Sequence, residues 1–283
     1  MAQQRNGLIT LHMSVLLMGI AGLFAKWLSL PAAVIVMWRV IFSSLFLLAV
    51  LKWKKTELRL SSRKDTWLLL AAGAVLAVHW TTFMQSIQTS TVAIGTLTFS
   101  TFPIFVTFLE PLLFDEKLKG ESVFSAVFML AGVLLIVPQF ELSNEMTQGI
   151  LWGMAGSLSY AVLSLMNRKF MEKYSSTLTA FYEQATAGIL LLPALFLSPA
   201  RASGHEFLVL ILLGVVFTAV AHTLYIESLR YVKVHTAGIV SGLESVYSII
   251  AAFIFLGESP SIREIAGGVL ILGAAFYTSI RAI

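Results

Sequence analysis

The chain has no cysteine, and only 12% of its 283 residues are charged. The absence of cysteine excludes a disulfide framework, a thiolate nucleophile and a cysteine-based metal site. Soluble domains carry roughly 25% charged residues. Apolar residues make up 58% of this chain, and its mean hydropathy is +0.86. A soluble fold of this length has too little interior to bury so much apolar surface. The composition therefore predicts an all-α polytopic membrane protein.

Motifs of catalysis are also missing. The only aspartates, Asp65 and Asp115, lie at the ends of apolar runs, so they do not form the paired site of an intramembrane aspartyl protease. The chain has no H-E-x-x-H sequence and no G-x-x-x-x-G-K-[ST] loop, the motifs of zinc proteases and P-loop ATPases. A nucleophile–histidine arrangement stays open, although no single serine is marked. We expect a protein that is not an enzyme and holds no cofactor or metal.

Ten apolar runs are long enough to cross a bilayer, which takes about 20 residues per helix. The first follows Arg5 and is long enough to span, so we expect an uncleaved helix rather than a signal peptide. Residues 139–148 join two halves, 1–140 and 141–283. The ten expected spans are 7–28, 31–51, 65–86, 90–114, 120–138, 148–170, 176–198, 206–229, 234–257 and 261–280.

The basic residues predict the orientation of these spans. The net charge of +4 comes from Lys and Arg in short connections, which is typical of a topology signal and not of a nucleic-acid surface. With the N-terminus inside, 15 of the 19 basic residues lie on the inner side, and only Lys26, Arg201 and Arg263 lie outside, with Arg39 inside a span. We therefore expect a multi-pass inner-membrane protein with both termini in the cytoplasm.

The two halves repeat each other at a shift of 142 residues. Residues 85–136 return in altered form as 227–277, so that Ser86 meets Ser228 and Trp80 meets His222. Each half has five expected spans, and an odd number makes the second half enter from the opposite side. An inverted-topology repeat around a central cavity suits alternating access.

Few ionisable residues lie within the expected spans, and such residues normally face a cavity or a partner. Glu244 lies near the middle of its span, where it could carry a proton or receive a substrate amine, or instead connect helices as a neutral or paired group. Arg39 and Glu183 occupy similar places in related spans and could form a gate or, as we favour, a packing bond. Glu110 lies near the inner end of its span, where it can reach the headgroups.

Aromatic and histidine side chains gather in the third and eighth spans. Positions three or four apart share a helix face, and such a face suits an amphipathic organic solute through stacking and cation–π contact. The alternative is ordinary helix packing. The candidate substrate-binding residues are His79, Trp80, Phe83, Phe99, His222, Tyr225 and Glu244.

Proline and glycine suggest where helices bend and touch. Pro103 and Pro111 interrupt the fourth expected span, and the counterpart of Pro103 is Ser245, so this place is either a hinge or a fixed kink. Arg39, Pro103 and Glu183 are thus the candidate gating or helix-pairing residues. Small residues such as Gly267 and Gly273 favour close helix contacts.

With these features the chain resembles the EamA family of the drug/metabolite transporter superfamily. The family's second-repeat signature matches Glu244 and the following span to Gly257-Glu258, although Ser245 stands where the family usually has proline. In the first half Pro103 is kept and Phe102 stands where a glutamate would be, and Arg39 resembles a recurrent family arginine. The resemblance implies a central cavity formed by spans 1–4 and 6–9, with spans 5 and 10 at the periphery. Within the family the chain is most similar to YddG-type exporters of aromatic and other amino acids.

The resulting hypothesis is a secondary transporter that exports amino acids or similar small metabolites, with the coupling ion open. Its partners would be a small-molecule substrate and the lipid bilayer, with no nucleic acid and with a homo-oligomer possible. Multidrug export is one alternative. Nucleotide-sugar exchange is another, but anionic substrates would require several cavity cations and only Arg39 lies at depth. A channel or an intramembrane enzyme remains from other classes.

Overall fold

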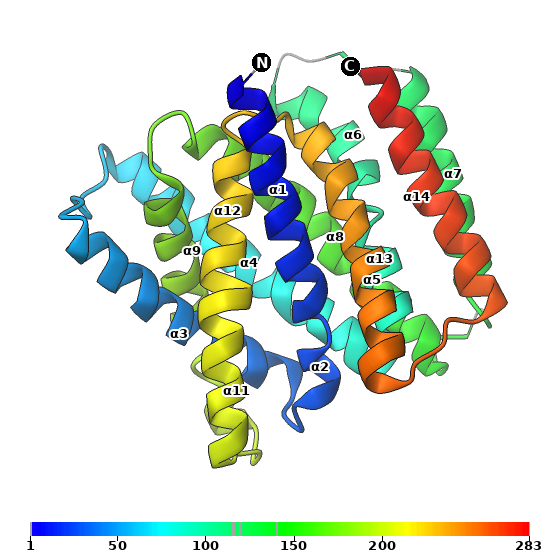
Figure 1. Ribbon diagram of the computed structural model, residues 1–283, viewed down its shortest axis with the longest axis horizontal. Helices are drawn as coiled ribbons and strands as arrows, with labels where there is room; N and C mark the ends of the chain where they lie inside the picture. Colours follow the sequence, from blue (N-terminus) through cyan, green and yellow to red (C-terminus); the bar gives the residue numbers. More distant parts are fainter. Residues whose placement is uncertain (1, 115–116, 119, 140, 283) are drawn as a thin grey trace.

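The computed structural model describes residues 2–114, 117–118, 120–139 and 141–282, and these residues form helices and no strands. Helical segments occupy each of the ten ranges expected from the sequence (Figure 1). Their bounds are α1 Ala2–Ala21, α2 Phe24–Trp27, α3 Ala32–Trp53, α4 Arg63–Thr89, α5 Val92–Phe99, α6 Phe102–Leu113, α7 Gly120–Ile136, α8 Glu145–Phe170, α9 Ser176–Leu191, α10 Ala194–Leu197, α11 Gly204–Gly214, η1 Val215–Val220, α12 Ala221–Ser228, α13 Val234–Leu256 and α14 Ile262–Ala282.

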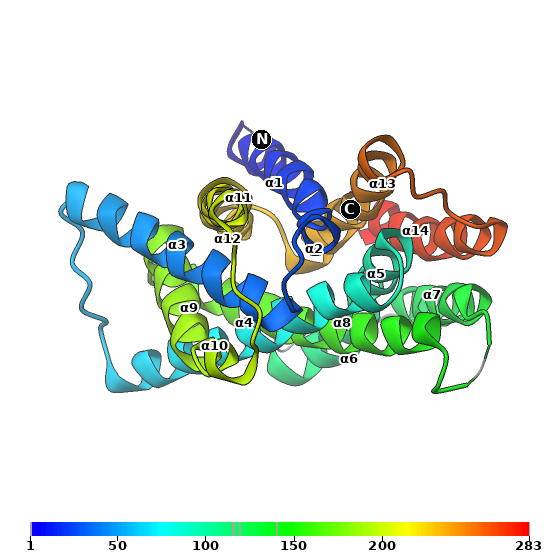
Figure 2. The same ribbon diagram turned by 90° about the horizontal axis from the view of Figure 1, so that it is seen from below.

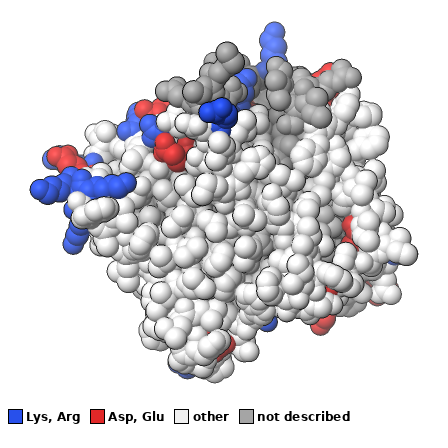
Figure 3. All heavy atoms as spheres, viewed as in Figure 1, with Lys and Arg blue, Asp and Glu red and all other residues white. Residues whose placement is uncertain are grey.

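Seven helical segments of the described chain are long and apolar enough to cross a membrane. Gly120–Ile136 and Val240–Leu256 are shorter apolar helices. Helix α1 begins and α14 ends at the same end of the bundle (Figure 1). On the face drawn in Figure 3, uncharged atoms cover most of the middle, and the charged side chains gather towards the rims. The uncharged middle of this face suits contact with a bilayer.

The helix break predicted at Pro103 is present. Helix α5 ends at Phe99, and Pro103 lies in the first turn of α6, where its missing N–H costs little. Ser245 of α13 spans the break, because its hydroxyl donates to the Thr96 carbonyl at 2.7 Å and lies 2.6 Å from the Ser100 hydroxyl. Pro111 lies inside α6, which continues past it.

A second irregular segment, the π-helix η1, was not predicted. It lies between α11 and α12, within the expected eighth span. The Thr218 hydroxyl donates to the Leu213 carbonyl, five residues earlier, at 2.7 Å. Short π segments often occur at functional sites because the extra residue changes which side chains face a neighbouring helix.

The two halves pack against each other reciprocally. Helix α4 lies along α8, and the related helices α12 and α1 also lie together. His79 Nδ1 is 2.9 Å from the Gly156 carbonyl, and the Ser14 hydroxyl donates to the Ala221 carbonyl at 2.7 Å. Adding 142 to 79 gives 221, and adding 142 to 14 gives 156, so the two contacts occupy equivalent positions. The sequence repeat is therefore also a repeat of contacts.

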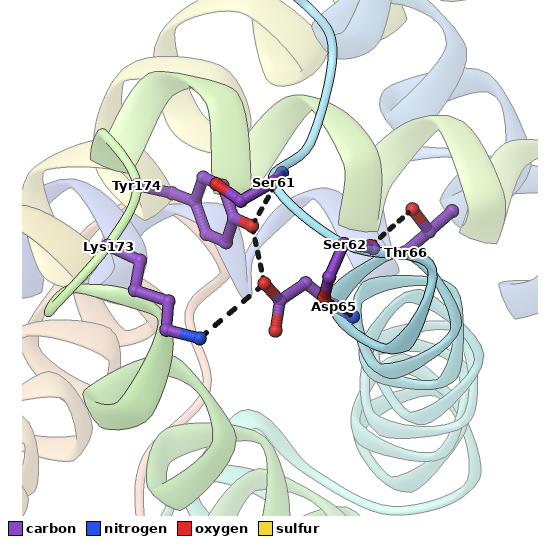
Figure 4. A network of polar contacts seen from close by, with 6 residues as sticks. All are labelled: Ser61, Ser62, Asp65, Thr66, Lys173 and Tyr174. Atoms are coloured by element: carbon purple, nitrogen blue, oxygen red, sulfur yellow. Dashed lines mark hydrogen bonds and ion pairs between the residues drawn. The ribbon is translucent and has the colours of Figure 1, made fainter.

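A polar network holds the start of α4 against the turn between α8 and α9 (Figure 4). The Tyr174 hydroxyl donates to Asp65 Oδ2 at 2.7 Å and accepts from the Ser61 N–H at 3.0 Å. Lys173 Nζ lies 3.6 Å from the same carboxylate oxygen. At the same end, Arg168 Nη1 lies 2.5 Å from Glu110 Oε1. Glu110 thus has an ion-pair partner, and it connects α6 to α8.

Helices α7 and α14 lie side by side at one edge of the molecule (Figures 1 and 2). This agrees with the peripheral place implied for spans 5 and 10. The backbones are in close contact there, since a Cβ at Gly267 would lie 2.7 Å from the Gly132 carbonyl oxygen. At Gly273, farther along α14, a Cβ would meet nothing within 4 Å. The predicted close packing therefore holds for Gly267 and not for Gly273.

We predict that Gly267→Ala lowers the thermal unfolding midpoint in detergent by at least about 3 °C, because overpacking typically costs 1–3 kcal/mol. Gly273→Ala is the matched control on the same helix and should leave the midpoint unchanged or raised. Equal midpoints for the two variants would contradict the close α7–α14 contact.

Candidate functional site

A buried cavity of about 20 Å³, room for roughly one water molecule, lies among helices from both halves of the chain. It is narrow, since the aromatic rings around it already touch one another, with 4.8 Å between the His79 and Tyr160 centroids and 4.9 Å between Phe99 and Tyr160. Its lining residues are Met18, Ala21, Arg39, His79, Trp80, Phe83, Phe99, Tyr160, Phe217, His222 and Glu244.

The cavity brings together most of the candidate residues. Among the predicted substrate-binding residues, Tyr225 does not line it. Tyr225 lies behind Tyr160, with ring centroids 5.4 Å apart, and its hydroxyl is 3.1 Å from the Ser164 hydroxyl. Glu183 and Pro103 also lie outside the lining.

Four lining residues were missed by the sequence reasoning: Met18, Ala21, Tyr160 and Phe217. Met18 and Tyr160 are 142 residues apart, as are Trp80 and His222, which were found. Applying the same shift to the first and sixth spans would have found Tyr160. No comparable signal marks Phe217, which lies in η1.

Arg39 of α3 provides the positive charge of the cavity and is 3% exposed. Its Nε donates to the Thr218 hydroxyl at 2.9 Å, and its Cζ lies 4.4 Å from the Trp80 ring centroid. These contacts fix the Nε edge and one face of the guanidinium. No described residue accepts a hydrogen bond from its Nη groups, so their donors are available to a ligand.

Glu244 of α13 lies in the same cavity and is 4% exposed. No described side chain forms a hydrogen bond or a salt bridge with its carboxyl group. A buried carboxyl group without such a partner is costly. The cavity therefore places Arg39 and Glu244, both available to a ligand, within a mostly aromatic wall.

The expected pairing of Arg39 with Glu183 is wrong. Glu183 Oε2 instead lies 2.8 Å from His222 Nε2 of α12. The next residue, Gln184, accepts a hydrogen bond from Ser43 of α3. Consecutive residues point about 100° apart around a helix. Helix α9 therefore faces α3 with Gln184 and α12 with Glu183.

Two related halves around a buried cavity with opposite charges define a membrane transporter. The chain belongs to the EamA-like transporter family, whose model matches residues 5–137 and again 147–280.

Curated relatives are transporters as well. The chain is 26% identical to the Bacillus subtilis transporter YxxF, over 99% of this chain and 91% of that protein. It is 29% identical to a transporter of Archaeoglobus fulgidus, over 95% and 94%, and 24% identical to the S-adenosylmethionine uptake transporter of Rickettsia prowazekii, over 96% and 92%. A solved crystal structure with 18% identity shares the fold, with a TM-score of 0.74 over 98% of this chain and 97% of that one.

We predict that Thr218→Val destabilises the protein by about 1–3 kcal/mol, because it leaves the buried Nε of Arg39 without an acceptor. Thr223→Val is the matched control, since the Thr223 hydroxyl is buried without a partner and its loss should be neutral or stabilising. Thermal unfolding in detergent measures both. Equal stability of the two variants would show that Thr218 does not hold Arg39.

Proposed function

We propose that this chain is a secondary carrier that exports α-amino acids and similar small zwitterionic metabolites by alternating access. Ten spans in two inverted halves, 1–140 and 141–283, would enclose the cavity, with both termini in the cytoplasm. The observation that carries the proposal is the presence of Arg39 and Glu244 in one aromatic-lined cavity.

The two charges suit the two ends of an α-amino acid. A guanidinium with free Nη donors binds a carboxylate through charge-assisted hydrogen bonds. A carboxylate on another helix binds the ammonium group. Phe83, Phe99 and Tyr160 then provide apolar and aromatic surface for the side chain of the substrate.

Alternating access fits the narrowness of the cavity. The lining comes from helices of both halves, so relative movement of the halves changes both the shape of the cavity and the side from which it is reached. The reciprocal contacts of α4 with α8 and of α1 with α12 are surfaces along which such a movement would occur.

A second candidate is the uptake of S-adenosylmethionine, which is named for the Rickettsia relatives. This molecule has the same α-amino-acid head, and its sulfonium cation suits aromatic faces. This second candidate differs from the first in the direction of flux. It also differs in the size of the substrate beyond its α-amino-acid head, the part that the aromatic wall would contact.

The proposal predicts that purified protein in liposomes exchanges labelled L-phenylalanine in counterflow. Glu244→Gln should weaken L-phenylalanine exchange by about tenfold or more, since one charge-assisted contact is worth about 1.5–3 kcal/mol. Inhibition by 3-phenylpropionate, which lacks the amine, should be unaffected by this change.

Arg39→Gln tests the other end of the substrate. This change should weaken inhibition by 3-phenylpropionate, which keeps the carboxylate, and leave inhibition by phenethylamine, which lacks it, unchanged. Exchange of S-adenosylmethionine alone would favour the second candidate. Counterflow of neither solute, or variants that fail to discriminate among the analogues, would contradict the recognition of an amino-acid head.

A further inference from the structure

A second polar cluster lies directly behind the cavity wall, between α8, α9 and α12. Its centre is the contact of 2.8 Å between Glu183 Oε2 and His222 Nε2. Glu183 is 0% exposed and His222 is 1% exposed. Moving two ionisable groups from water into the protein interior costs free energy. Hydrophobic residues of similar volume in their place are often neutral or stabilising. Helix packing alone therefore does not account for this pair.

The cluster has an unusual number of buried polar atoms without a hydrogen-bond partner. His222 Nδ1 and the hydroxyl of Thr179 are two of them. The Asn167 side chain of α8 adjoins the Glu183 carboxyl group, but the two do not form a well-aligned hydrogen bond. Such atoms are rare in folded proteins and indicate bound water, an ion or a chemical role. Thr179 and Glu183 are four residues apart on α9, so these atoms follow one helix face. Thr179 lies in the first turn of α9, so the row leads from His222 towards the start of that helix.

His222 connects the cluster to the cavity. Its ring lines the cavity and lies 5.2 Å from the Trp80 ring, edge to face. Trp80 in turn carries the Arg39 guanidinium on its own ring. A change of charge on the Glu183–His222 pair would therefore occur next to the groups that would bind the substrate.

We propose that the Glu183–His222 pair is the proton-binding site that couples transport to proton movement. This inference rests on the proposed function as a carrier. A proton from hydronium on one side adds to the pair, whose net charge changes from −1 (carboxylate and neutral imidazole) to 0. The same proton leaves to water on the other side after the halves have moved. Only N–H or O–H bonds form and break, and no other reactant is needed.

Other ionisable groups face this region from the helices packed against it, but they lie outside the Glu183–His222 pair. Arg39 and Glu244 lie in the cavity itself, and the His79 Nδ1–H donates to the Gly156 carbonyl. The tyrosines nearby are Tyr160 and Tyr225, and at the helix ends Asp65 contacts Tyr174, Tyr182 bonds to the Leu58 carbonyl and Glu227 pairs with Arg230.

The test uses liposomes that contain the wild-type protein and a trapped pH-sensitive dye. A gradient of L-phenylalanine should move protons in the wild type, whereas Glu183→Gln should lose at least about 90% of that proton movement. Counterflow of labelled L-phenylalanine should persist in Glu183→Gln, because glutamine keeps the volume and a hydrogen bond to His222. Glu110→Gln, the same change at the Arg168 ion pair, is the matched control and should keep both activities.

Failure of the two proposals can be distinguished. If the wild type shows no counterflow, the proposed function is wrong for L-phenylalanine, and the proton site is tested without substrate by ¹⁵N NMR of the histidine rings. The ring signals of His222 should then differ between spectra recorded in acid and in base, and Glu183→Gln should change that difference. Wild-type His222 signals that are the same in both spectra would overturn the inference. So would proton movement in Glu183→Gln equal to that of the wild type, or a folded Glu183→Gln without counterflow.

Discussion

The cost of a charged group inside an apolar helical bundle is the constraint on which this structure depends. Arg39, Glu183 and Glu244 are each less than 5% exposed, in a chain with only 12% charged residues. Each therefore requires a partner, a ligand or a proton. Arg39 has Thr218 and the Trp80 ring, and Glu183 has His222. Glu244 has no hydrogen-bonding side chain among the described residues, and this is why a ligand is the simplest explanation for it.

The reciprocal packing of the two halves places these groups together. Because equivalent positions meet across the interface, a single repeat unit used twice encloses a cavity without a separate domain to cover it. The two halves differ at positions that line the cavity. Met18 of the first half has Tyr160 as its counterpart in the second, and Trp80 has His222, so the cavity is not symmetric in polarity.

Much of this could be predicted from the sequence. Apolar runs and short polar links gave the helical ranges, Pro103 gave the break between α5 and α6, and the 142-residue shift gave Trp80 and His222. The partner of Glu183 could not be predicted, because it depends on which side of α9 faces α12 once Gln184 is bound to Ser43. The π-helix at Thr218 and the lining role of Phe217 depend on tertiary contacts in the same way. The hydrophobic periodicity of the sequence does not indicate either of them.

The most direct measurement is an experimental structure of the protein with 4-iodo-L-phenylalanine, located by the anomalous signal of iodine. The account predicts one iodine among Phe83, Phe99 and Tyr160, with the carboxylate on Arg39 and the ammonium on Glu244. An iodine that lies only outside this cavity, or an amino acid in the cavity that touches neither charge, would contradict it.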